Sequence, residues 1–455
     1  MKNQLLEKIR SRSAKVSIIG LGYVGLPLAV ETAKVGFQVL GVENNPNRCK
    51  LVNEGKNFIK DVQDAEFSGL VAKGLIHAEV TFASVAQADV VIICVPTPLN
   101  KNKEPDISYI ENATDGICKN FKPGCLVVLE STTYPGTTEE IIQTRIEKMG
   151  HKVGKDFFLA FSPERVDPGN KSFNTKNTTK IIGGVTKDCL EVAEVFYKQV
   201  IQNVVLVSSP RVAEMTKVFE NVYRSVNIAL VNELSSLCER MDIDIYEVIA
   251  AADTKPYGFQ AFWPGPGVGG HCIPLDPYYL AWKGKEYDIH TRFIELAGEI
   301  NENMPYTVVA KCGEILNGIE QSLRGSRILQ LGISYKKDID DYRESPSVRI
   351  YELLQKSGAH VDVCDPWVKE FFVHEHDATY GNAGPGVKTK PLTPELIAQA
   401  DLVLITTDHS NFPYSEIAAQ AKLVFDTRNA LGFRKITSNR IFKLPTPVPT
   451  SGLKA

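Results

Sequence analysis

The chain has 455 residues, which is too long for one ordinary globular core and predicts two or three domains; we expect three. Hydrophobic residues make up 43% and charged residues 23%, a balance that excludes a disordered chain. The formal net charge of -3 gives no general attraction to nucleic acid, and no apolar run reaches the ~18 residues of a membrane span, so we expect neither partner.

The first 15 residues form a charged amphipathic segment, which predicts a surface helix and not an export signal. We therefore expect a cytoplasmic protein. Nine cysteines stand singly along the chain, and none forms a CxxC pair. This spacing favours buried reduced thiols over a disulfide framework or a zinc site, and no metal is expected.

From Lys15 the sequence alternates apolar strand-like runs with helical patterns, and a second, similar series begins after Gly325. Such alternation predicts parallel sheets with helices on both faces. The expected fold class is α/β, with two Rossmann-like doubly wound domains joined by a long central helix and a helical middle domain. The expected domains are a Rossmann-like domain at 1–208, a helical middle domain carrying the cysteine loop at 209–315, a second Rossmann-like domain at 316–445 and a disordered tail at 446–455.

The central segment from Pro210 to about Met241 has no internal Gly or Pro and repeats apolar residues at helical spacing. It predicts one helix of roughly 45 Å at about 1.5 Å per residue. Apolar residues on more than one face favour burial between domains or across a dimer. The Gly/Pro-rich stretch from Phe262 to Pro277 predicts an ordered loop.

A glycine fingerprint follows the first predicted strand, with Gly20, Gly22 and Gly25 opening a helical pattern. Such glycines permit a tight turn and close backbone approach, and the helix N-terminus faces a pyrophosphate. Glu43 lies at the end of the next strand, where its carboxylate would accept hydrogen bonds from the adenosine ribose and repel a 2'-phosphate. These residues predict NAD as the cofactor.

The second Rossmann-like region has no such fingerprint. It offers Gly332 alone, followed by Lys336 and Arg343. Two domains of one fold need not bind the same ligand. The basic pair favours an anionic ligand other than a second dinucleotide, such as a nucleoside diphosphate.

Cys272 stands out among the cysteines because Gly269 and Gly270 precede it in the loop. We expect these glycines to expose the backbone and leave the sulfur open to a substrate carbon, which makes Cys272 the candidate nucleophile. Asp276, four residues on, is a candidate to act as a base or to orient a water. The alternative is an inert cysteine.

Lys217 and Asn221 lie four residues apart in the predicted central helix and therefore share a face. An ammonium and an amide together would stabilise a developing oxyanion, whereas the alternative is a solvated surface pair. Thr132 and Glu164 follow two predicted strands, where parallel sheets place ligand contacts. Alternatively, each is an ordinary loop residue.

Taken together, these segments resemble the UDP-glucose/GDP-mannose dehydrogenase family from about Lys15 to Arg428. The resemblance rests on the ordered motifs GLGYVGLPLA, VPTP, STTYPGT, SPERVDPG, AEMTKVFENVYRSVNIALVNE, PGPGVGGHCIPLDPYYL and LGISYKKDIDDYRESPS. It implies a four-electron oxidation of a nucleotide sugar's 6-hydroxyl to a carboxylate with two NAD. It further implies that Cys272 forms a thiohemiacetal and then a thioester, which water hydrolyses.

The resemblance also implies that 1–208 is the NAD-binding domain, that 209–315 is the dimerisation domain and that 316–445 is the UDP-binding domain. It further assigns roles to individual residues. The implied catalytic set is Cys272, Lys217, Asn221, Asp276, Thr132 and Glu164. The implied cofactor set is Gly20, Gly22, Tyr23, Val24, Gly25, Glu43, Arg48, Pro96, Thr97 and Thr132. The implied substrate set is Glu164, Arg165, Val166, Lys217, Asn221, Gly269, Lys336, Arg343 and Arg428.

The finer motif pattern is most similar to family members that act on UDP-N-acetylhexosamines, with UDP-N-acetylglucosamine as the first expectation. UDP-glucose, UDP-N-acetylgalactosamine and UDP-N-acetylmannosamine are the alternatives. A two-electron hydroxyacid-type dehydrogenase and a non-catalytic NAD-binding protein are alternatives of other classes. The family habit further implies a homodimer through the central helix and a role in making surface polysaccharide precursors.

Overall fold

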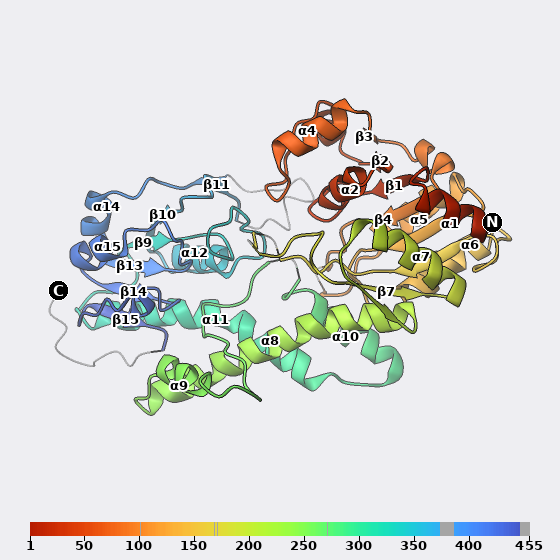
Figure 1. The fold of residues 1–455 in the computed structure, drawn as a ribbon. Helices are drawn as coiled ribbons and strands as arrows, with labels where there is room; N and C mark the ends of the chain where they lie inside the picture. The colour runs from red at the N-terminus through yellow and green to blue at the C-terminus, as the bar shows by residue number, and fades with distance from the viewer. Residues whose placement is uncertain (101, 168, 171, 271, 374–385, 446–455) are drawn as a thin grey trace. The chain divides into compact units, whose positions relative to one another are not determined.

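The computed structural model describes residues 1–100, 102–167, 169–170, 172–270, 272–373 and 386–445, so the expected disordered tail lies outside the described residues. The chain forms two compact units (Figure 1). The first comprises residues 1–220 and 278–290, and the second comprises residues 221–277 and 291–455. Within the described ranges, no helix combines the length and hydropathy needed to cross a membrane.

The first unit is built on an eight-stranded sheet with the strand order β3-β2-β1-β4-β5-β6-β7-β8. Its strands are β1 (Lys15–Ile19), β2 (Gln38–Val42), β3 (Ile76–Glu79), β4 (Val90–Ile93), β5 (Leu126–Leu129), β6 (Phe158–Phe161), β7 (Lys180–Gly184) and β8 (Val204–Val207). Its helices are α1 (Lys2–Arg10), α2 (Gly25–Lys34), α3 (Pro46–Asn53), α4 (Asp64–Ala72), α5 (Ser108–Lys119), α6 (Thr144–Glu147) and α7 (Lys187–Val200), with short turns η1 (Ala83–Gln87) and η2 (Thr138–Gln143).

Side chains alternate between the two faces of this sheet and build two cores. Val16 and Ile18 of β1 pack with α1, α2 and α7, whereas Ile19 faces the core that contains α5 and α6. The predicted surface helix at the N-terminus is α1, and it packs on α7. Helices therefore cover both faces, as the doubly wound prediction requires.

Two strands of this sheet, β7 and β8, run against the other six. β7 pairs antiparallel with β6, with Ala160 opposite Gly184 and Phe161 opposite Gly183, and β8 then runs parallel to β7. The segment between β6 and β7 holds no helix in its described part. An antiparallel neighbour needs no crossover helix. The reversal brings the first residue of β7, Lys180, to the edge where β4, β5 and β6 end.

The second unit carries a five-stranded, all-parallel sheet with the order β10-β9-β13-β14-β15, and β11 and β12 form a separate antiparallel pair (blue in Figure 1). The strands are β9 (Arg327–Leu331), β10 (His360–Cys364), β11 (Glu370–Phe371), β12 (Val387–Lys388), β13 (Leu402–Ile405), β14 (Val424–Asp426) and β15 (Ile441–Lys443). The helices are α9 (Ile245–Ala252), α11 (Arg292–Asn317), α12 (Pro346–Lys356), α14 (Pro394–Gln399) and α15 (Tyr414–Gln420), with a short turn η4 (Gly432–Arg434). One face of the sheet packs on α11 and α12, and the other on α14 and α15. The second Rossmann-like domain is thus confirmed.

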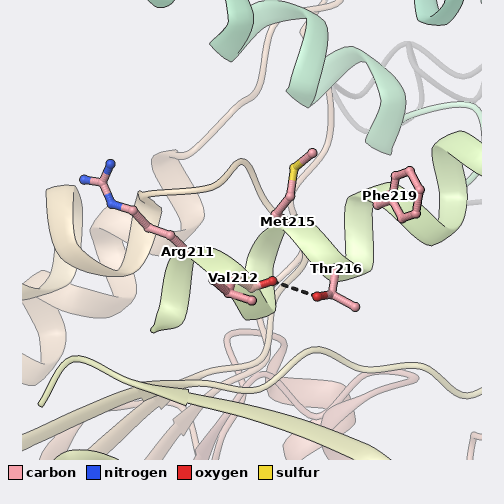
Figure 2. Close-up of a pocket in the computed structure, with 5 residues that line it drawn as sticks. All are labelled: Arg211, Val212, Met215, Thr216 and Phe219. Carbon is pink, nitrogen blue, oxygen red and sulfur yellow. Dashed lines mark hydrogen bonds between the residues drawn. The ribbon is translucent and has the colours of Figure 1, made fainter. Parts of the chain in front are cut away.

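The predicted central helix is α8 (Pro210–Arg240), a single helix of 31 residues that begins in the first unit and continues into the second. Its exposed side carries apolar side chains. Figure 2 shows the first two turns of this side, where Arg211, Val212, Met215, Thr216 and Phe219 line an open cavity of about 310 Å³.

The predicted loop from Phe262 to Pro277 is two residues shorter than expected. Helix α10 (Asp276–Gly284) already begins at Asp276, so the loop prediction is wrong for its last two residues. Pro277 occupies the first turn of this helix, where a missing N–H costs nothing. The short turn η3 (Lys285–Tyr287) follows.

Candidate active site

The glycine fingerprint lies after β1, between β2 and β4, where the strand order reverses direction. Gly20 has a φ of +91°, and its N–H donates to Val42 O at 2.8 Å. A Cβ on Gly25 would lie 1.9 Å from Gly20 O, so the fold itself requires glycine there. A Cβ on Gly22 would meet no protein atom within 4 Å. The space beside Gly22 fits close approach of a dinucleotide phosphate.

Glu43 follows β2 beside this loop and is 4% exposed. Its Oε2 accepts from Leu21 N–H at 3.1 Å, and its Oε1 accepts from Asn45 N–H at 3.0 Å. A carboxylate has about four acceptor positions, so two remain for a ribose diol. Of the neighbouring cofactor candidates, Arg48 is exposed, with its guanidinium 5.7 Å from the Phe58 ring centroid.

The remaining predicted cofactor residues lie around the same edge of the sheet. Tyr23 is 45% exposed, and Val24 directly precedes α2. Pro96 and Thr97 follow β4, and Thr97 Oγ1 donates to Thr132 O at 2.6 Å. The structure therefore brings Thr97 and Thr132 together from two neighbouring strands.

Glu164 follows β6 and has a side chain that is 15% exposed. Its Oε1 accepts from the N–H groups of Arg165 at 2.8 Å and Val166 at 2.7 Å. Arg165 forms a two-pronged ion pair with Glu220 of α8 and donates to Thr179 O. Its guanidinium thus anchors this segment within the first unit.

Lys217 and Asn221 are 8% and 4% exposed, so the alternative of a solvated surface pair is wrong. Asn221 Nδ2 donates to Asp276 Oδ2 at 2.5 Å, and Asp276 is itself 2% exposed. Buried polar side chains must find partners. The structure thereby joins two of the predicted catalytic residues, which lie 55 residues apart in the sequence.

Of the nine cysteines, all of which the structure describes, Cys272 alone is exposed. Six others are buried, and burial raises the pKa of both Cys125 and Cys364 to about 12. Neutral buried thiols are poor nucleophiles. The backbone carbonyl of Cys272 accepts from Asp276 N–H at 2.8 Å, which ties the thiol to the start of α10.

The glycines before Cys272 have a different role from the one expected. A Cβ on Gly269 would lie 2.6 Å from Tyr335 Cβ and 2.8 Å from Glu344 O. A Cβ on Gly270, whose φ is +89°, would lie 2.9 Å from the Tyr335 ring. The prediction that they expose the backbone is therefore wrong: they let the cysteine loop pack tightly against the loop that follows β9.

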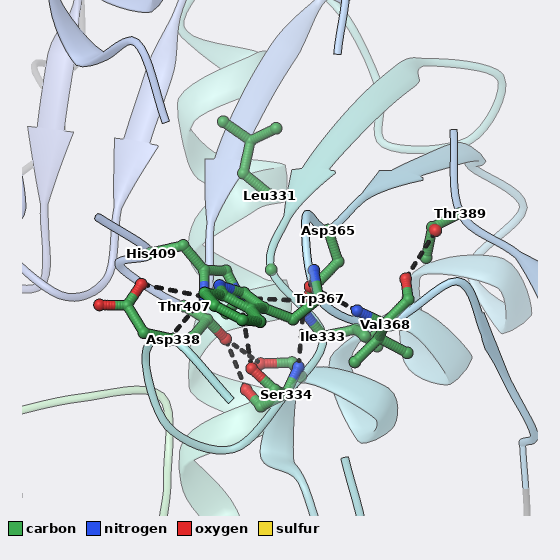
Figure 3. Close-up of polar contacts among 12 residues, drawn as sticks. Leu331, Ile333, Ser334, Asp338, Asp365, Trp367, Val368, Thr389, Thr407 and His409 are labelled. Carbon is green, nitrogen blue, oxygen red and sulfur yellow. Dashed lines mark hydrogen bonds and ion pairs between the residues drawn. The ribbon is translucent and has the colours of Figure 1, made fainter. Parts of the chain in front are cut away.

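The second sheet repeats the geometry of the first with different chemistry. Gly332 has a φ of +90°, and Asp365 follows β10 as Glu43 follows β2. Figure 3 shows Asp365 next to buried His409, with Nε2 and Oδ2 3.0 Å apart. His409 Nδ1 accepts from Asp338 N–H at 2.9 Å, which places the ring proton on Nε2, facing Asp365.

Asp365 has no capacity left for a ribose. Besides the imidazole, it accepts from four backbone N–H groups, those of Ile333, Ser334, Trp367 and Val368. Burial opposes its ionisation, but His409 and these donors hold its pKa below the usual value. Five donors exceed the roughly four acceptor positions of a carboxylate. This geometry supports the expectation that the domain takes no second dinucleotide.

The three basic substrate candidates of this domain lie on its loops. Lys336 is half-buried, and its carbonyl accepts from Ser334 Oγ at 2.9 Å. Arg343 donates from Nε and Nη2 to Asp341, both at 2.8 Å. Arg428 Nε donates to Thr406 O at 3.0 Å. The guanidinium groups of Arg343 and Arg428 are thus held in place by bonds within their own domain.

Sequence reasoning missed several residues of the first unit. Tyr279 of α10 is 1% exposed and donates to Thr97 O, and Lys283 pairs with Glu140 at 2.8 Å. The sequence signal that could have identified Tyr279 and Lys283 is the run of aromatic and charged residues directly after the cysteine loop. A second missed group is Lys180 with Glu130, charged residues that flank buried apolar strands.

Three family models match the chain, and all describe parts of the UDP-glucose/GDP-mannose dehydrogenase family. The NAD binding domain matches residues 14–201, the central domain residues 211–303 and the UDP binding domain residues 329–433.

Individual relatives match most of the chain. A UDP-N-acetyl-D-mannosamine dehydrogenase of Methanococcus maripaludis is 34% identical over 434 residues, covering 92% of this chain and 93% of that protein. A UDP-N-acetyl-D-glucosamine 6-dehydrogenase of Pseudomonas aeruginosa is 37% identical over 373 residues, covering 81% and 86%. The solved structure of a UDP-D-ManNAc dehydrogenase from Pyrococcus horikoshii superposes with a TM-score of 0.83 at 30% identity, covering 94% of this chain and 99% of that one.

We expect Gly22→Ala to separate NAD binding from folding. The added methyl meets no protein atom, so the melting temperature should stay unchanged, whereas NAD affinity should fall by about tenfold or more because the methyl occupies space beside the phosphates. Calorimetry and NAD titration measure the two effects. Gly69→Ala, which also meets nothing within 4 Å, is the control. Unchanged NAD affinity in Gly22→Ala would contradict this assignment.

Proposed function

The chain belongs to the UDP-glucose/GDP-mannose dehydrogenase family of NAD-dependent nucleotide-sugar oxidoreductases, and we propose that it oxidises the 6-hydroxyl of a UDP-N-acetylhexosamine to a carboxylate. The observation that carries this proposal is the exposed thiol of Cys272, four residues before Asp276, which begins α10 and bonds to buried Asn221. A nucleophile and positioned polar groups are what a four-electron oxidation through a covalent intermediate needs.

Bound NAD supplies the hydride acceptor in each of the two oxidations. In the first, the 6-hydroxyl gives its proton to a water that Asp276 and Thr132 position, and Lys217 and Asn221 stabilise negative charge on the substrate oxygen as the alcohol becomes an aldehyde. The Cys272 sulfur then adds to the aldehyde carbon while the thiol proton passes to the aldehyde oxygen, and the resulting thiohemiacetal has a tetrahedral C–H from which a second hydride can leave. Loss of that hydride, together with loss of the hydroxyl proton to water, yields a thioester.

The thioester is hydrolysed by water. The water oxygen adds to the carbonyl carbon while one of its protons moves to Glu164, and the C–S bond breaks to release the carboxylate and the Cys272 thiol. Asp276 and Thr132 position water and assist proton transfer. Burial of Lys217 supports its role in stabilising negative charge on the substrate oxygen, because charges act more strongly away from bulk water.

We propose that the C-terminal domain holds the UDP moiety through Lys336, Arg343 and Arg428. The matching family model for this part is described as a UDP binding domain. Guanidinium groups suit diphosphate oxygens because they donate in pairs. When UDP binds, Arg343 would donate to phosphate oxygens in place of its two hydrogen bonds to Asp341, or would donate to both groups.

The sugar is proposed to be UDP-N-acetylglucosamine, for use in surface polysaccharide synthesis. Relatives between 31% and 37% identical carry names for N-acetylmannosamine, N-acetylglucosamine and N-acetylgalactosaminuronic acid dehydrogenases. A solved UDP-glucose dehydrogenase is 26% identical. The acetamido group is common to the sugars in the first set of names, and this supports the class.

Cys272→Ala should abolish uronate formation. Without the sulfur the aldehyde cannot become tetrahedral for the second oxidation, so we expect a loss of roughly 10³-fold or more, the scale seen on removing a nucleophile. The wild type should release two NADH per uronate, measured by absorbance and mass spectrometry. Cys118→Ala, at a half-buried thiol, should retain activity. Two NADH per sugar from Cys272→Ala would rule out the thioester route.

A panel of four UDP-sugars tests the substrate. We expect kcat/KM for UDP-N-acetylglucosamine to exceed that for UDP-glucose by about tenfold or more, because a pocket that bonds the acetamido group rejects a sugar lacking it. UDP-N-acetylmannosamine and UDP-N-acetylgalactosamine complete the panel. Preference for either keeps the acetamido class but changes the sugar, whereas preference for UDP-glucose overturns both.

We also propose a homodimer formed through α8. Large apolar side chains lie exposed along this helix at spacings of three, four or seven residues: Val212, Met215, Phe219, Tyr223, Leu230, Leu234 and Leu237. A contiguous apolar stripe of this length indicates an interaction surface. A second copy of the same stripe is its matching partner, because twofold dimers pair one surface with itself.

Phe219→Asp should therefore weaken the dimer, because it places a charge in the apolar stripe, where Phe219 is 60% exposed. Light scattering should give twice the chain mass of 50.3 kDa for the wild type and a single chain mass for the variant at micromolar concentration. Lys198→Glu on α7 is the surface control. A wild type that is monomeric would refute the dimer, and an unchanged dimer in Phe219→Asp would exclude this part of α8 from it.

A further inference from the structure

A buried ammonium lies between two carboxylates at the carboxyl edge of the first sheet. Lys180 is 4% exposed, and its Nζ lies 2.8 Å from Glu130 Oε2 and 3.4 Å from Glu164 Oε2. All three belong to the first unit, from β5, β6 and β7. A buried charge is tolerated only when it is paired and hydrogen-bonded.

The two carboxylates differ in access. The Glu130 side chain has no exposed surface, and its other oxygen accepts from the hydroxyl of Tyr197, which is also fully buried. Glu164 retains 15% exposure. Glu130 therefore cannot reach a substrate or water from outside, whereas Glu164 can.

One ammonium thus serves two carboxylates. Glu130 holds the shorter contact to Lys180, and Glu164 holds the longer one while two backbone N–H groups bind its other oxygen. The Lys180 ammonium therefore interacts with both carboxylates, and the strength of its interaction with Glu164 depends on Glu130.

We propose that Lys180 and Glu130 are positioning residues for Glu164: Lys180 keeps Glu164 as an oriented carboxylate, and Glu130 limits this effect by competing for the ammonium. The inference rests on the proposed function, in which Glu164 accepts the proton of the water that hydrolyses the Cys272 thioester. A base must be ionised yet still basic, so both a partner and a competitor are needed.

The electrostatics agree with this arrangement. Burial opposes ionisation of Glu164, but Lys180, the N–H groups of Val166 and Arg165, and Lys217 hold its pKa below the usual value. Burial raises the pKa of Glu130 despite Lys180. Loss of the Lys180 charge removes the first of the groups that oppose burial and leaves only the two N–H groups and Lys217, so the pKa of Glu164 should then rise.

The test compares Lys180→Met and Glu130→Gln by the pH dependence of kcat for uronate formation. Lys180→Met should move the acid limb to higher pH by about one unit or more, a tenfold change in the ionised fraction. At pH values on this shifted acid limb it should also accumulate the acyl group on Cys272, visible as added protein mass. Glu130→Gln should move the acid limb to lower pH, because Glu164 then has the ammonium to itself.

Opposite shifts from two changes in one ion pair are not expected from a purely structural role. Asp89→Asn is the matched control, since Asp89 is a buried carboxylate paired with Lys122 just before β4, at the other end of the strands, and its profile should match the wild type. If Lys180→Met fails to fold, Glu130→Gln carries the test. Acid limbs that coincide with the wild type in every folded variant would overturn this inference alone, whereas a wild type that reduces no NAD with any UDP-sugar would overturn the proposed function and this inference together.

Discussion

The buried charge of Lys180 determines which side chains lie beside it at the carboxyl edge of the first unit's sheet. An ammonium that is 4% exposed requires negative partners close by, and Glu130 and Glu164 provide them from the ends of β5 and β6. Lys180 reaches this edge because β7 runs against β6. A parallel β7 would present its last residue there instead. The reversal of chain direction at β7 is thus what supplies the carboxyl edge with a cation.

The two Rossmann-like domains show how one backbone turn can serve different ligands. Gly20 and Gly332 share a φ near +90°, and an acidic residue follows the neighbouring strand in both domains. Glu43 retains hydrogen-bond acceptor positions, whereas the acceptor positions of Asp365 are all taken by His409 and four backbone N–H groups. A shared fold therefore does not determine the ligand. The two domains differ in whether the carboxylate after the neighbouring strand still has acceptor positions for a ribose.

Helix α8 combines two kinds of surface on one element. Lys217 and Asn221 face inward and are nearly buried, while Phe219 and Tyr223 between and after them remain exposed. Because side chains three or four residues apart share a helical face, a substitution on one face of α8 leaves the side chains of the other face unchanged. The helix can therefore carry polar groups for chemistry and an apolar stripe for association.

Local patterns in the sequence were enough to predict the glycine turn at Gly20, the length of α8 and the strands of the parallel part of each sheet, since each depends on residues close together in the sequence. They did not predict that β7 and β8 run against the other strands of the first sheet. The exposed state of Cys272, the bond between Asn221 and Asp276 and the packing reason for Gly269 were decided by tertiary structure. The same holds for Lys180, whose partner Glu130 lies 50 residues away. Long-range pairs leave no periodic trace in a sequence, because only folding brings their elements together.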